Sequence, residues 1–270
     1  MSGATGLLGR ALSKVLRREG NEVTRFSRQV RPGYYSISDN QQLSLCEKFV
    51  HLGEPANISS YSLPGYQNSR TLSINLKHLI DVFGSSLTYA SSGAVYGTST
   101  QTLHSVRDPT FGLDPYTTLK LIHEEMVLDT GGGVLRFSNI FGPTMSEDTV
   151  IAKLSQQIRG NLQIPLQQNA VRDYLFVEEA VRAISLTLAK KTPPILNIAT
   201  GLGRDVNQLV GEIAQVLEIR ELRIVREAER QPINCNVLSI TETKNVLGWH
   251  PSLDFKNQIR RTLFVEKQEK

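Results

Sequence analysis

Hydrophobic residues along this chain recur at two spacings, one typical of helices and one typical of strands. Residues 7–18 carry apolar side chains every three or four positions, which predicts an amphipathic helix, and residues 22–27 alternate as a strand does. Further helices are predicted over 43–49, 70–83, 149–159, 178–189 and 206–217, strands over 34–37, 50–53, 87–90 and 195–198, and loops over 54–68 and 162–170. Strands that alternate with helices at this pace predict βαβ units and a parallel sheet.

Three glycines at a spacing of three, Gly3, Gly6 and Gly9, stand just before and within the first predicted helix. In a strand–turn–helix unit such glycines let the backbone approach a bulky anion and let the helix lie close to a sheet. The helix N-terminus then offers unpaired N–H groups and a positive dipole end to a phosphate. The pattern alone is also compatible with an ordinary N-terminal loop and helix cap.

A buried strand normally precedes this glycine pattern, but only Met1 and Ser2 stand before Gly3. In a doubly wound sheet that strand lies between the second strand and the one ending at Gly53. Its loss would leave backbone ladder groups without partners and would open an apolar slot. We therefore expect that Met1 is an internal or mis-assigned start, or that another segment fills the slot.

The second predicted strand ends at Ser27 and Arg28, with no acidic residue. At this place in a dinucleotide-binding unit, an acidic side chain hydrogen-bonds the adenosine 2′-hydroxyl, whereas an arginine accommodates a 2′-phosphate. The sequence therefore favours NADP over NAD as cofactor. An arginine in a solvated loop would give the same pattern.

The most informative polar residues follow the strand predicted over 87–90. Ser92 stands at the carboxyl edge of the expected sheet, where such sheets bind ligands. Asp114 and Pro115 predict the start of a helix on which Tyr116 and Lys120 lie one turn apart. A lysine cation beside a phenol stabilises the phenolate, and a tyrosine tuned in this way serves as a general acid and base. A bare Tyr-x-x-x-Lys also occurs on ordinary helix surfaces, but here it is combined with the glycine loop and the serine.

Together these motifs resemble the extended branch of the short-chain dehydrogenase/reductase superfamily, which contains the nucleotide-sugar epimerases and dehydratases. The resemblance covers essentially the whole chain, in motifs at 3–9, 51–53, 92–97, 116–120, 135–143, 172–180, 197–201 and 247–251. It implies an α/β fold, a doubly wound, Rossmann-like parallel sheet with a small C-terminal substrate lobe. The expected dinucleotide-binding core is 1–143 plus 171–200, and the expected substrate lobe is 144–170 plus 201–270.

The resemblance also implies roles for individual residues. Ser92, Tyr116 and Lys120 match the catalytic triad. Cofactor contacts are implied for Gly3, Thr5, Gly6, Leu7, Leu8, Gly9, Ser27, Arg28, Ser36, Ile37, Leu52, Gly53, Tyr116 and Lys120. Substrate contacts are implied for Ser92, Asn139, Arg172 and Arg230. Arg230 matches the second phosphate-binding arginine better than Arg226 does, judged by its distance from Trp249, which we expect to be a packing residue.

The activity that follows from this resemblance is NADP-linked oxidoreduction at a carbon, C4 above all, of a nucleotide-linked sugar, with NAD as the alternative cofactor. A 4-epimerase and a 4-ketoreductase share this chemistry, and Arg28 slightly favours reduction. A 4,6-dehydratase is not expected, because Gly93 and Ala94 stand where those enzymes carry an Asp-Glu pair. A different class stays open: an NADP-binding sensor or scaffold of the same fold, in which the catalytic Tyr or Lys is usually lost.

Composition narrows the partners. A chain of 270 residues with 40% hydrophobic and 21% charged residues is ordinary for a globular protein. It has no apolar run of the roughly 18 residues that span a membrane and no secretory signal, so we expect no membrane partner and a cytoplasmic location. Cys46 and Cys235 make neither a disulfide framework nor a metal site. The net charge of +4 is scattered, which argues against nucleic acid and fits small anionic ligands. The resemblance implies a homodimer through the helices at 70–83 and 116–128.

Overall fold

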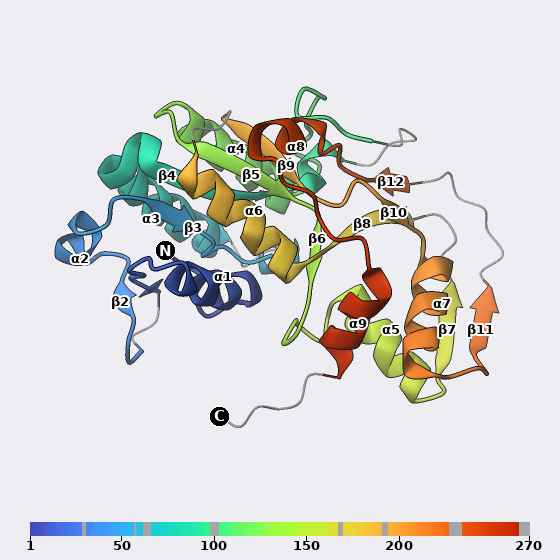
Figure 1. Ribbon diagram of the computed structural model, residues 1–270. Helices are drawn as coiled ribbons and strands as arrows, with labels where there is room; N and C mark the ends of the chain where they lie inside the picture. Colours follow the sequence, from blue (N-terminus) through green and yellow to red (C-terminus); the bar gives the residue numbers. More distant parts are fainter. Residues whose placement is uncertain are drawn as a thin grey trace.

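A parallel β-sheet with helices on both faces forms the larger part of the molecule, and a smaller lobe lies beside it (Figure 1). The computed structural model describes residues 1–28, 31–56, 58–61, 66–97, 103–166, 170–190, 194–226 and 234–264. This architecture confirms the doubly wound, Rossmann-like fold expected from the sequence.

The large sheet is parallel throughout. Its strands are β1 (Phe26–Ser27), β2 (Tyr35–Ser36), β3 (Phe49–His51), β4 (Leu87–Ser92), β5 (Gly133–Phe137) and β9 (Ile195–Ile198). Four of them pair in the order β3-β4-β5-β9, and β1 pairs with β2. Buried strands of this kind present their carboxyl ends along one edge, so that β3 and β4 deliver the residues that follow them to neighbouring places.

Ser2 joins these two groups of strands. It forms parallel bridges to both Phe26 of β1 and His51 of β3. The backbone N–H of Ser2 donates to Val50 O at 3.1 Å, and that of Phe26 donates to Met1 O at 2.9 Å. The slot expected for the first strand is therefore the place where Met1 and Ser2 lie, whereas an upstream extension stays a prediction.

The helices cover the sheet in two pairs. On one face α1 (Leu7–Arg18) packs on α6 (Val177–Ala189), and on the other α3 (Tyr66–Phe83) packs on α4 (Pro115–Leu128) (Figure 1). Leu12 and Leu16 of α1 join one apolar core, and Leu76 and Leu79 of α3 join the other. Shorter helical segments are α2 (Asn40–Ser44), η1 (Ile58–Tyr61), η2 (Gly84–Ser86) and η3 (Gly93–Tyr96).

Helix α4 begins as its sequence predicts. The Asp114 carboxylate accepts the backbone N–H of Thr117 at 2.9 Å, and the Thr117 hydroxyl accepts that of Asp114 at 3.1 Å. This reciprocal capping box satisfies two N–H groups that the helix itself leaves unpaired, and Pro115 occupies the first helical position. The start of α4 fixes Tyr116 and Lys120 on one side of the helix.

A second sheet is built around strand β8 (Ala170–Phe176). β8 pairs in parallel with β6 (Asn139–Phe141) and β12 (Asn234–Asn236), and antiparallel with β10 (Gly203–Arg204). The remaining elements of the chain are β7 (Gln163–Leu166), β11 (Arg223–Arg226), α5 (Val150–Arg159), α7 (Val206–Leu217), α8 (Thr241–Leu247) and α9 (Phe255–Leu263). Helix α8 packs on β9 of the large sheet and on α6. Trp249 is completely buried in the larger apolar core, which confirms it as a packing residue.

Two local predictions are wrong. The helix expected over 43–49 is instead α2, because the Asp39 carboxylate caps the N–H of Gln42 and sets the start at Asn40. Phe49 belongs to β3, where it pairs with Leu87. The loop expected over 162–170 contains β7, which pairs in parallel with β11. Strand pairing with a distant segment is invisible to a local pattern.

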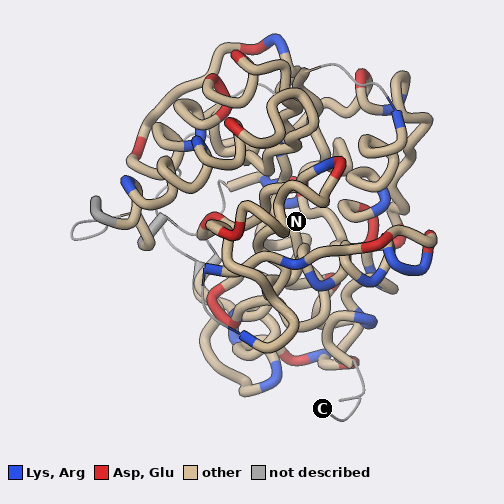
Figure 2. Tube along the Cα trace, turned by 90° about the vertical axis from the view of Figure 1, so that its left-hand side faces the viewer, with Lys and Arg blue, Asp and Glu red and all other residues tan. Residues whose placement is uncertain are grey.

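Helix ends and the surface complete the picture. Helix α3 starts at Tyr66, earlier than its periodicity indicates, and the strand predicted over 22–27 is confined to β1. Basic and acidic residues are spread over the whole trace (Figure 2), although α1 carries four basic residues and no acidic one. Within the described ranges, no helix is both long enough and apolar enough to cross a bilayer.

Candidate functional site

The glycine loop between Ser2 and α1 is shaped by close backbone contacts. A Cβ atom on Gly3, whose φ is +66°, would lie 2.2 Å from Leu52 O, and one on Gly9 would lie 2.2 Å from Gly3 O. Packing therefore excludes a side chain at both positions. A Cβ on Gly6 would meet only Gly3 O, at 3.4 Å. Packing alone does not demand a glycine there, whereas a ligand lying against the loop would.

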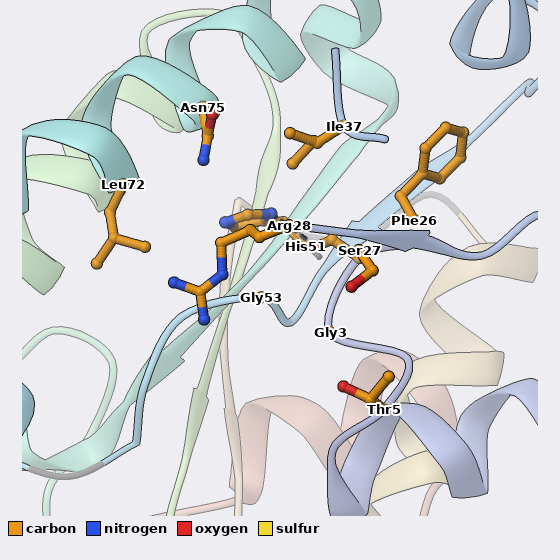
Figure 3. A pocket seen from close by; sticks show the side chains of 11 residues that line it. Gly3, Thr5, Phe26, Ser27, Arg28, Ile37, His51, Gly53, Leu72 and Asn75 are labelled. Atoms are coloured by element: carbon orange, nitrogen blue, oxygen red, sulfur yellow. Dashed lines mark hydrogen bonds between the residues drawn. The ribbon is translucent and has the colours of Figure 1, made fainter. Parts of the chain in front are cut away.

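A pocket of about 430 Å³ opens between this loop and helix α3 (Figure 3). Thr5, at the start of α1, faces it from one side, and Leu72 and Asn75 of α3 face it from the other. The complete lining is Ser2, Gly3, Thr5, Phe26, Ser27, Arg28, Ile37, His51, Gly53, Leu72 and Asn75. The pocket thus lies at the carboxyl ends of β1 and β3, where doubly wound sheets bind ligands.

The lining brings together six of the residues expected to bind the cofactor: Gly3, Thr5, Ser27, Arg28, Ile37 and Gly53. The other residues expected to bind the cofactor are not part of this lining. Ser36 is exposed, and its hydroxyl lies 2.8 Å from that of Ser38. Leu7 and Leu8 belong to the first turn of α1, and Leu52 supports Gly3 from below. His51 is 3% exposed and pairs with the Ser2 hydroxyl at 2.8 Å, and it also lines the pocket.

The three predicted catalytic residues come from two neighbouring elements. Ser92 ends β4, and its hydroxyl accepts the N–H of Ala94 at 3.2 Å, which caps η3. Tyr116 and Lys120 are buried on α4, at 7% and 5% exposure. The Lys120 Nζ atom lies 5.9 Å from the centre of the Tyr116 ring. Helix α4 packs on β4 and η3, so all three residues belong to one contiguous part of the structure.

The ammonium of Lys120 has two direct partners. It donates to Ala90 O at 2.8 Å, and it pairs with the Glu54 carboxylate at 2.9 Å. It also lies 4.7 Å from the centre of the Tyr89 ring. Glu54 lies in the loop after β3, directly after Gly53. The charged partner of the predicted catalytic lysine is thus a residue that the sequence motifs do not mark.

Glu54 is the centre of a buried polar group. Its side chain is 2% exposed; the Tyr89 hydroxyl donates to it at 2.7 Å, and His123 Nδ1 lies 2.7 Å from it. The His51 Nε2 atom lies 3.7 Å away. Burial alone would raise the pKa of Glu54, but the Lys120 cation and the two histidines hold that pKa well below its usual range. Glu54, Lys120, His123, His51 and Tyr89 are called the Lys120 cluster below.

A second buried charged group lies on the neighbouring side of α4. The Glu124 carboxylate pairs with Arg136 of β5 at 2.6 Å and accepts the hydroxyl proton of Ser91. Arg136 also donates to the Tyr96 hydroxyl at 2.9 Å, and that hydroxyl donates to Asn197 at 2.8 Å. Burial alone would lower the pKa of Arg136, but Glu124 holds it above its ordinary value. Glu124, Arg136, Ser91, Tyr96 and Asn197 are called the Arg136 cluster below.

Two of the residues expected to bind substrate, Asn139 and Arg172, lie where β6 meets β8. The Asn139 amide donates to Asp173 O at 3.0 Å, and Arg172 donates to Asn234 O at 2.6 Å. Burial lowers the pKa of Arg172. Asp173 is fully buried and accepts the backbone N–H groups of Thr200 and Gly201, although burial still raises its pKa. The structure therefore brings Asn139 and the Arg172 segment together.

Arg230 lies outside the described residues. Sequence reasoning also missed Glu54, His123, Leu72 and Asn75. One usable signal exists for His123: residues 116, 120, 123 and 127 form the buried stripe of α4, so polar residues in this stripe must find buried partners. Nothing in the chain near Glu54 reveals its partner. In the described part of the chain, no group of three or more His, Cys, Asp or Glu residues could hold a metal ion.

Comparison with known proteins gives a family and a fold. The profile of the NAD dependent epimerase/dehydratase family matches residues 1–199. No curated protein matches the sequence. Several solved structures are similar over nearly the full length, including UDP-glucose 4-epimerase from Thermotoga maritima with UDP-glucose, at 21% identity, a TM-score of 0.82, and coverage of 97% of this chain and 96% of that chain.

Two further similar structures carry different cofactors. MoeE5 in complex with UDP-glucuronic acid and NAD is 23% identical, with a TM-score of 0.80 and coverage of 97% of this chain and 96% of that chain. RMD from Pseudomonas aeruginosa complexed with NADPH is also 23% identical, with a TM-score of 0.77 and coverage of 96% of this chain and 95% of that chain. At these identities the likeness shows the fold alone.

Proposed function

Because the chain belongs to the NAD dependent epimerase/dehydratase family, we propose that it catalyses hydride transfer at C4 of the sugar of a nucleotide sugar. The observation that carries this proposal is the position of Tyr116 and Lys120. Both are buried on α4, which packs on the strand that ends at Ser92, and the pocket of about 430 Å³ opens beside β3, the next strand of the sheet.

The proposed division of labour follows from the chemistry of each side chain. The Tyr116 hydroxyl passes a proton to or from the sugar oxygen as general acid and base. The Lys120 cation favours the phenolate and binds the nicotinamide ribose. The Ser92 hydroxyl donates to the same sugar oxygen and stabilises its developing charge. The nicotinamide supplies the hydride chemistry when bound, and the protein's part is to orient it and to exclude water.

The pocket supports a dinucleotide as cofactor. Its wall begins with the glycine loop and the N-terminus of α1, which suit a pyrophosphate. Ser27 and Arg28 stand at the far end of β1, with no acidic residue between them and Thr5 in the lining. We assign NADP on this ground, because a guanidinium pairs well with a 2′-phosphate and gives a ribose 2′-hydroxyl no acceptor.

Replacement of Arg28 tests the choice of cofactor. Arg28→Ala should weaken NADPH binding by roughly tenfold, as expected for one lost charge-assisted hydrogen bond, and should leave NADH binding within about twofold. Fluorescence titration of both cofactors measures this, with the exposed Arg18→Ala as a control variant. Equal losses for the two cofactors would contradict a 2′-phosphate contact.

The proposal that the substrate is a nucleotide sugar rests on Asn139 and Arg172. Asn139 and Arg172 lie together at the β6–β8 junction, and their expected partners are the sugar nucleotide and its pyrophosphate. Arg230 is proposed as the second phosphate contact. Similar structures that hold UDP-glucose or UDP-glucuronic acid support a nucleotide sugar as substrate.

Epimerisation and reduction are separated by the fate of the cofactor. A 4-ketoreductase consumes one NADPH per turnover, whereas a 4-epimerase returns the hydride and shows no net loss. We propose reduction, on the strength of Arg28. Incubation with NADPH and a panel of 4-keto-6-deoxy and 4-hydroxy nucleotide sugars, followed by absorbance and by chromatography of the sugars, decides between them. A new sugar with no NADPH loss would contradict reduction.

A homodimer through α3 and α4 is proposed as the working form. Ile74 of α3 and Ile122 of α4 are 58% and 48% exposed, which is high for isoleucine on two adjacent helices. Light scattering after gel filtration should give twice the chain mass. Ile122→Glu should shift the mass to that of a monomer.

A further inference from the structure

Glu54 is a buried ionisable residue to which the proposed reaction assigns no role. Its side chain is 2% exposed, and it lies on the loop that follows β3, next to the pocket-lining Gly53. A carboxylate at this depth is costly to bury unless it is paired and hydrogen-bonded. Its partners therefore indicate what it is there to hold.

The strongest of those partners is Lys120. The ammonium of lysine has three N–H donors and no acceptor. One is directed to Ala90 O at 2.8 Å and one to Glu54 at 2.9 Å. These two acceptors come from β4 and from the loop after β3, so they restrain the ammonium from two directions. The third N–H donor is used by neither of these two acceptors.

Glu54 is itself held in place. The Tyr89 hydroxyl donates to one of its oxygens at 2.7 Å, and His123 Nδ1 lies 2.7 Å from the other. The second ring nitrogen of His123 lies 2.8 Å from the Ser73 hydroxyl on α3. Each carboxylate oxygen thus has a fixed partner besides Lys120 or His51, and the carboxylate cannot turn away from the ammonium without losing them.

Several ionisable groups face this carboxylate, and all of them bear on its charge. They are His51 from β3, Tyr89 from β4, Tyr61 from η1, and Lys120 and His123 from α4, whereas Tyr116 of α4 acts on Tyr61 and Tyr89. Burial lowers the pKa of His51, so this histidine adds no positive charge at neutral pH. Burial and the nearby carboxylate raise the pKa of Tyr89, which therefore stays a donor. Within the cluster, Lys120 and Glu54 form a direct ion pair at 2.9 Å.

We propose that Glu54 is a positioning residue for Lys120: it fixes the direction of the ammonium and stabilises its charge, so that one N–H donor stays presented to the cofactor. His123 acts through Glu54 by fixing its carboxylate. The role rests on the proposed function, because it assumes that Lys120 meets the cofactor. The structural part, the Glu54–Lys120 pair, stands without that assumption.

The test is a titration of the full-length protein with NADPH between pH 7 and pH 9.5. Glu54→Gln should weaken binding by roughly tenfold, and the loss should grow with pH, because a buried ammonium without its carboxylate loses its proton more readily. Glu54→Asp keeps the negative charge but places it farther from Lys120. The loss of NADPH affinity should then no longer grow with pH, although the full affinity should not return. Glu124→Gln removes an equally buried carboxylate from α4, the helix that carries Lys120, and should change affinity by less than about twofold.

Three results would overturn the proposal. One is an affinity of Glu54→Gln that equals the parent's at every pH in a folded protein. Another is a loss that is the same at all pH values. The third is an equal loss in Glu124→Gln, which would mean that loss of either buried carboxylate near α4 weakens binding alike.

Failure of the proposed function would look different. The parent protein would then bind neither NADPH nor NADH. Melting of Glu54→Gln, Lys120→Met and the double variant, without cofactor, would decide the pair in that case. If Glu54 holds Lys120, the double variant melts higher than Glu54→Gln alone, because the unpaired ammonium is gone. Additive losses would overturn the pairing itself.

Discussion

Helix α4 carries two consecutive buried ionisable residues, His123 and Glu124, and each belongs to a different cluster. His123 contacts Glu54 in the Lys120 cluster, and Glu124 contacts Arg136 in the Arg136 cluster. Both clusters hold one carboxylate against one cation in the protein interior. They differ in their surroundings: His51 of the Lys120 cluster lines the pocket, whereas no member of the Arg136 cluster does.

The comparison shows that burial of a charge does not by itself mark a functional site. In the Arg136 cluster the charged pair is connected to Asn197 of β9, whose amide donates to His104 O at 3.0 Å. Its bonds join strands and loops of the core. In the Lys120 cluster the cation lies 5.9 Å from the centre of the Tyr116 ring, and His51 lines the pocket. We expect the first cluster to govern stability and the second to govern cofactor binding and chemistry.

The largest expected effect is on the chemical step. Tyr116→Phe removes the proposed acid–base hydroxyl and should lower kcat by about 10²- to 10⁴-fold, the usual contribution of general acid–base catalysis. Cofactor affinity and melting temperature should change little. Steady-state turnover with NADPH and the active nucleotide sugar measures this. A cellular function that survives the substitution would favour the sensor or scaffold alternative.

The second effect separates the clusters by stability. Glu124→Gln leaves the buried guanidinium of Arg136 without its carboxylate and should lower the free energy of unfolding by about 3–5 kcal/mol. Urea unfolding measures the loss. Glu178→Gln, which breaks an ion pair with Arg261 between half-exposed side chains, is the matched control and should cost less than about 1 kcal/mol. Comparable losses in the two variants would contradict the structural role of the Arg136 cluster.

The third effect is the pH dependence of the stability that Glu54 contributes. The pKa of Glu54 lies below its unfolded value, so this carboxylate contributes stability above the unfolded pKa and loses the contribution as the pH falls through the folded pKa. The parent protein should therefore be more stable than Glu54→Gln near pH 7, and the gap should shrink below about pH 4.5. Urea unfolding of both proteins from pH 3 to pH 7 checks this. A gap of constant size would mean that the charge of Glu54 is not what stabilises the fold.

The smallest effect tests how α4 presents both clusters. Asp114→Ala removes the capping carboxylate and should cost about 1 kcal/mol of stability. The residues of both clusters lie further along the helix, so NADPH affinity should stay within about twofold. Thermal melting and the same fluorescence titration measure the two quantities. A loss of NADPH binding free energy larger than the loss of unfolding free energy would show that the start of α4 itself positions Tyr116.

The order of elements and the motif residues could be predicted from the sequence. The periodicity of 7–18 gave α1 with its observed bounds, and Asp114-Pro115 gave the start of α4. Short-range rules suffice there, because capping and helical periodicity act within one or two turns. The same rules failed at β7 and α2, where a partner strand in one case and a side-chain cap in the other decided the outcome.

Glu54 illustrates the limit of motif-based prediction for the site. It stands directly after the glycine that ends a recognisable strand motif, yet its partners Lys120 and His123 lie far along the chain. Leu72 and Asn75 likewise reach the pocket only because α3 lies over the ends of β1 and β3. Such contacts depend on how helices pack on the sheet, and no local pattern encodes that.

By itself the sequence determined the α/β order, the glycine loop and the one-turn separation of Tyr116 and Lys120, because each of these is set by neighbours within a few residues. Only the tertiary structure decided which buried carboxylate pairs with which buried cation. Lys120 pairs with Glu54 and Arg136 pairs with Glu124 because α4 packs on the sheet. A charge buried in that contact is stable only beside an opposite charge.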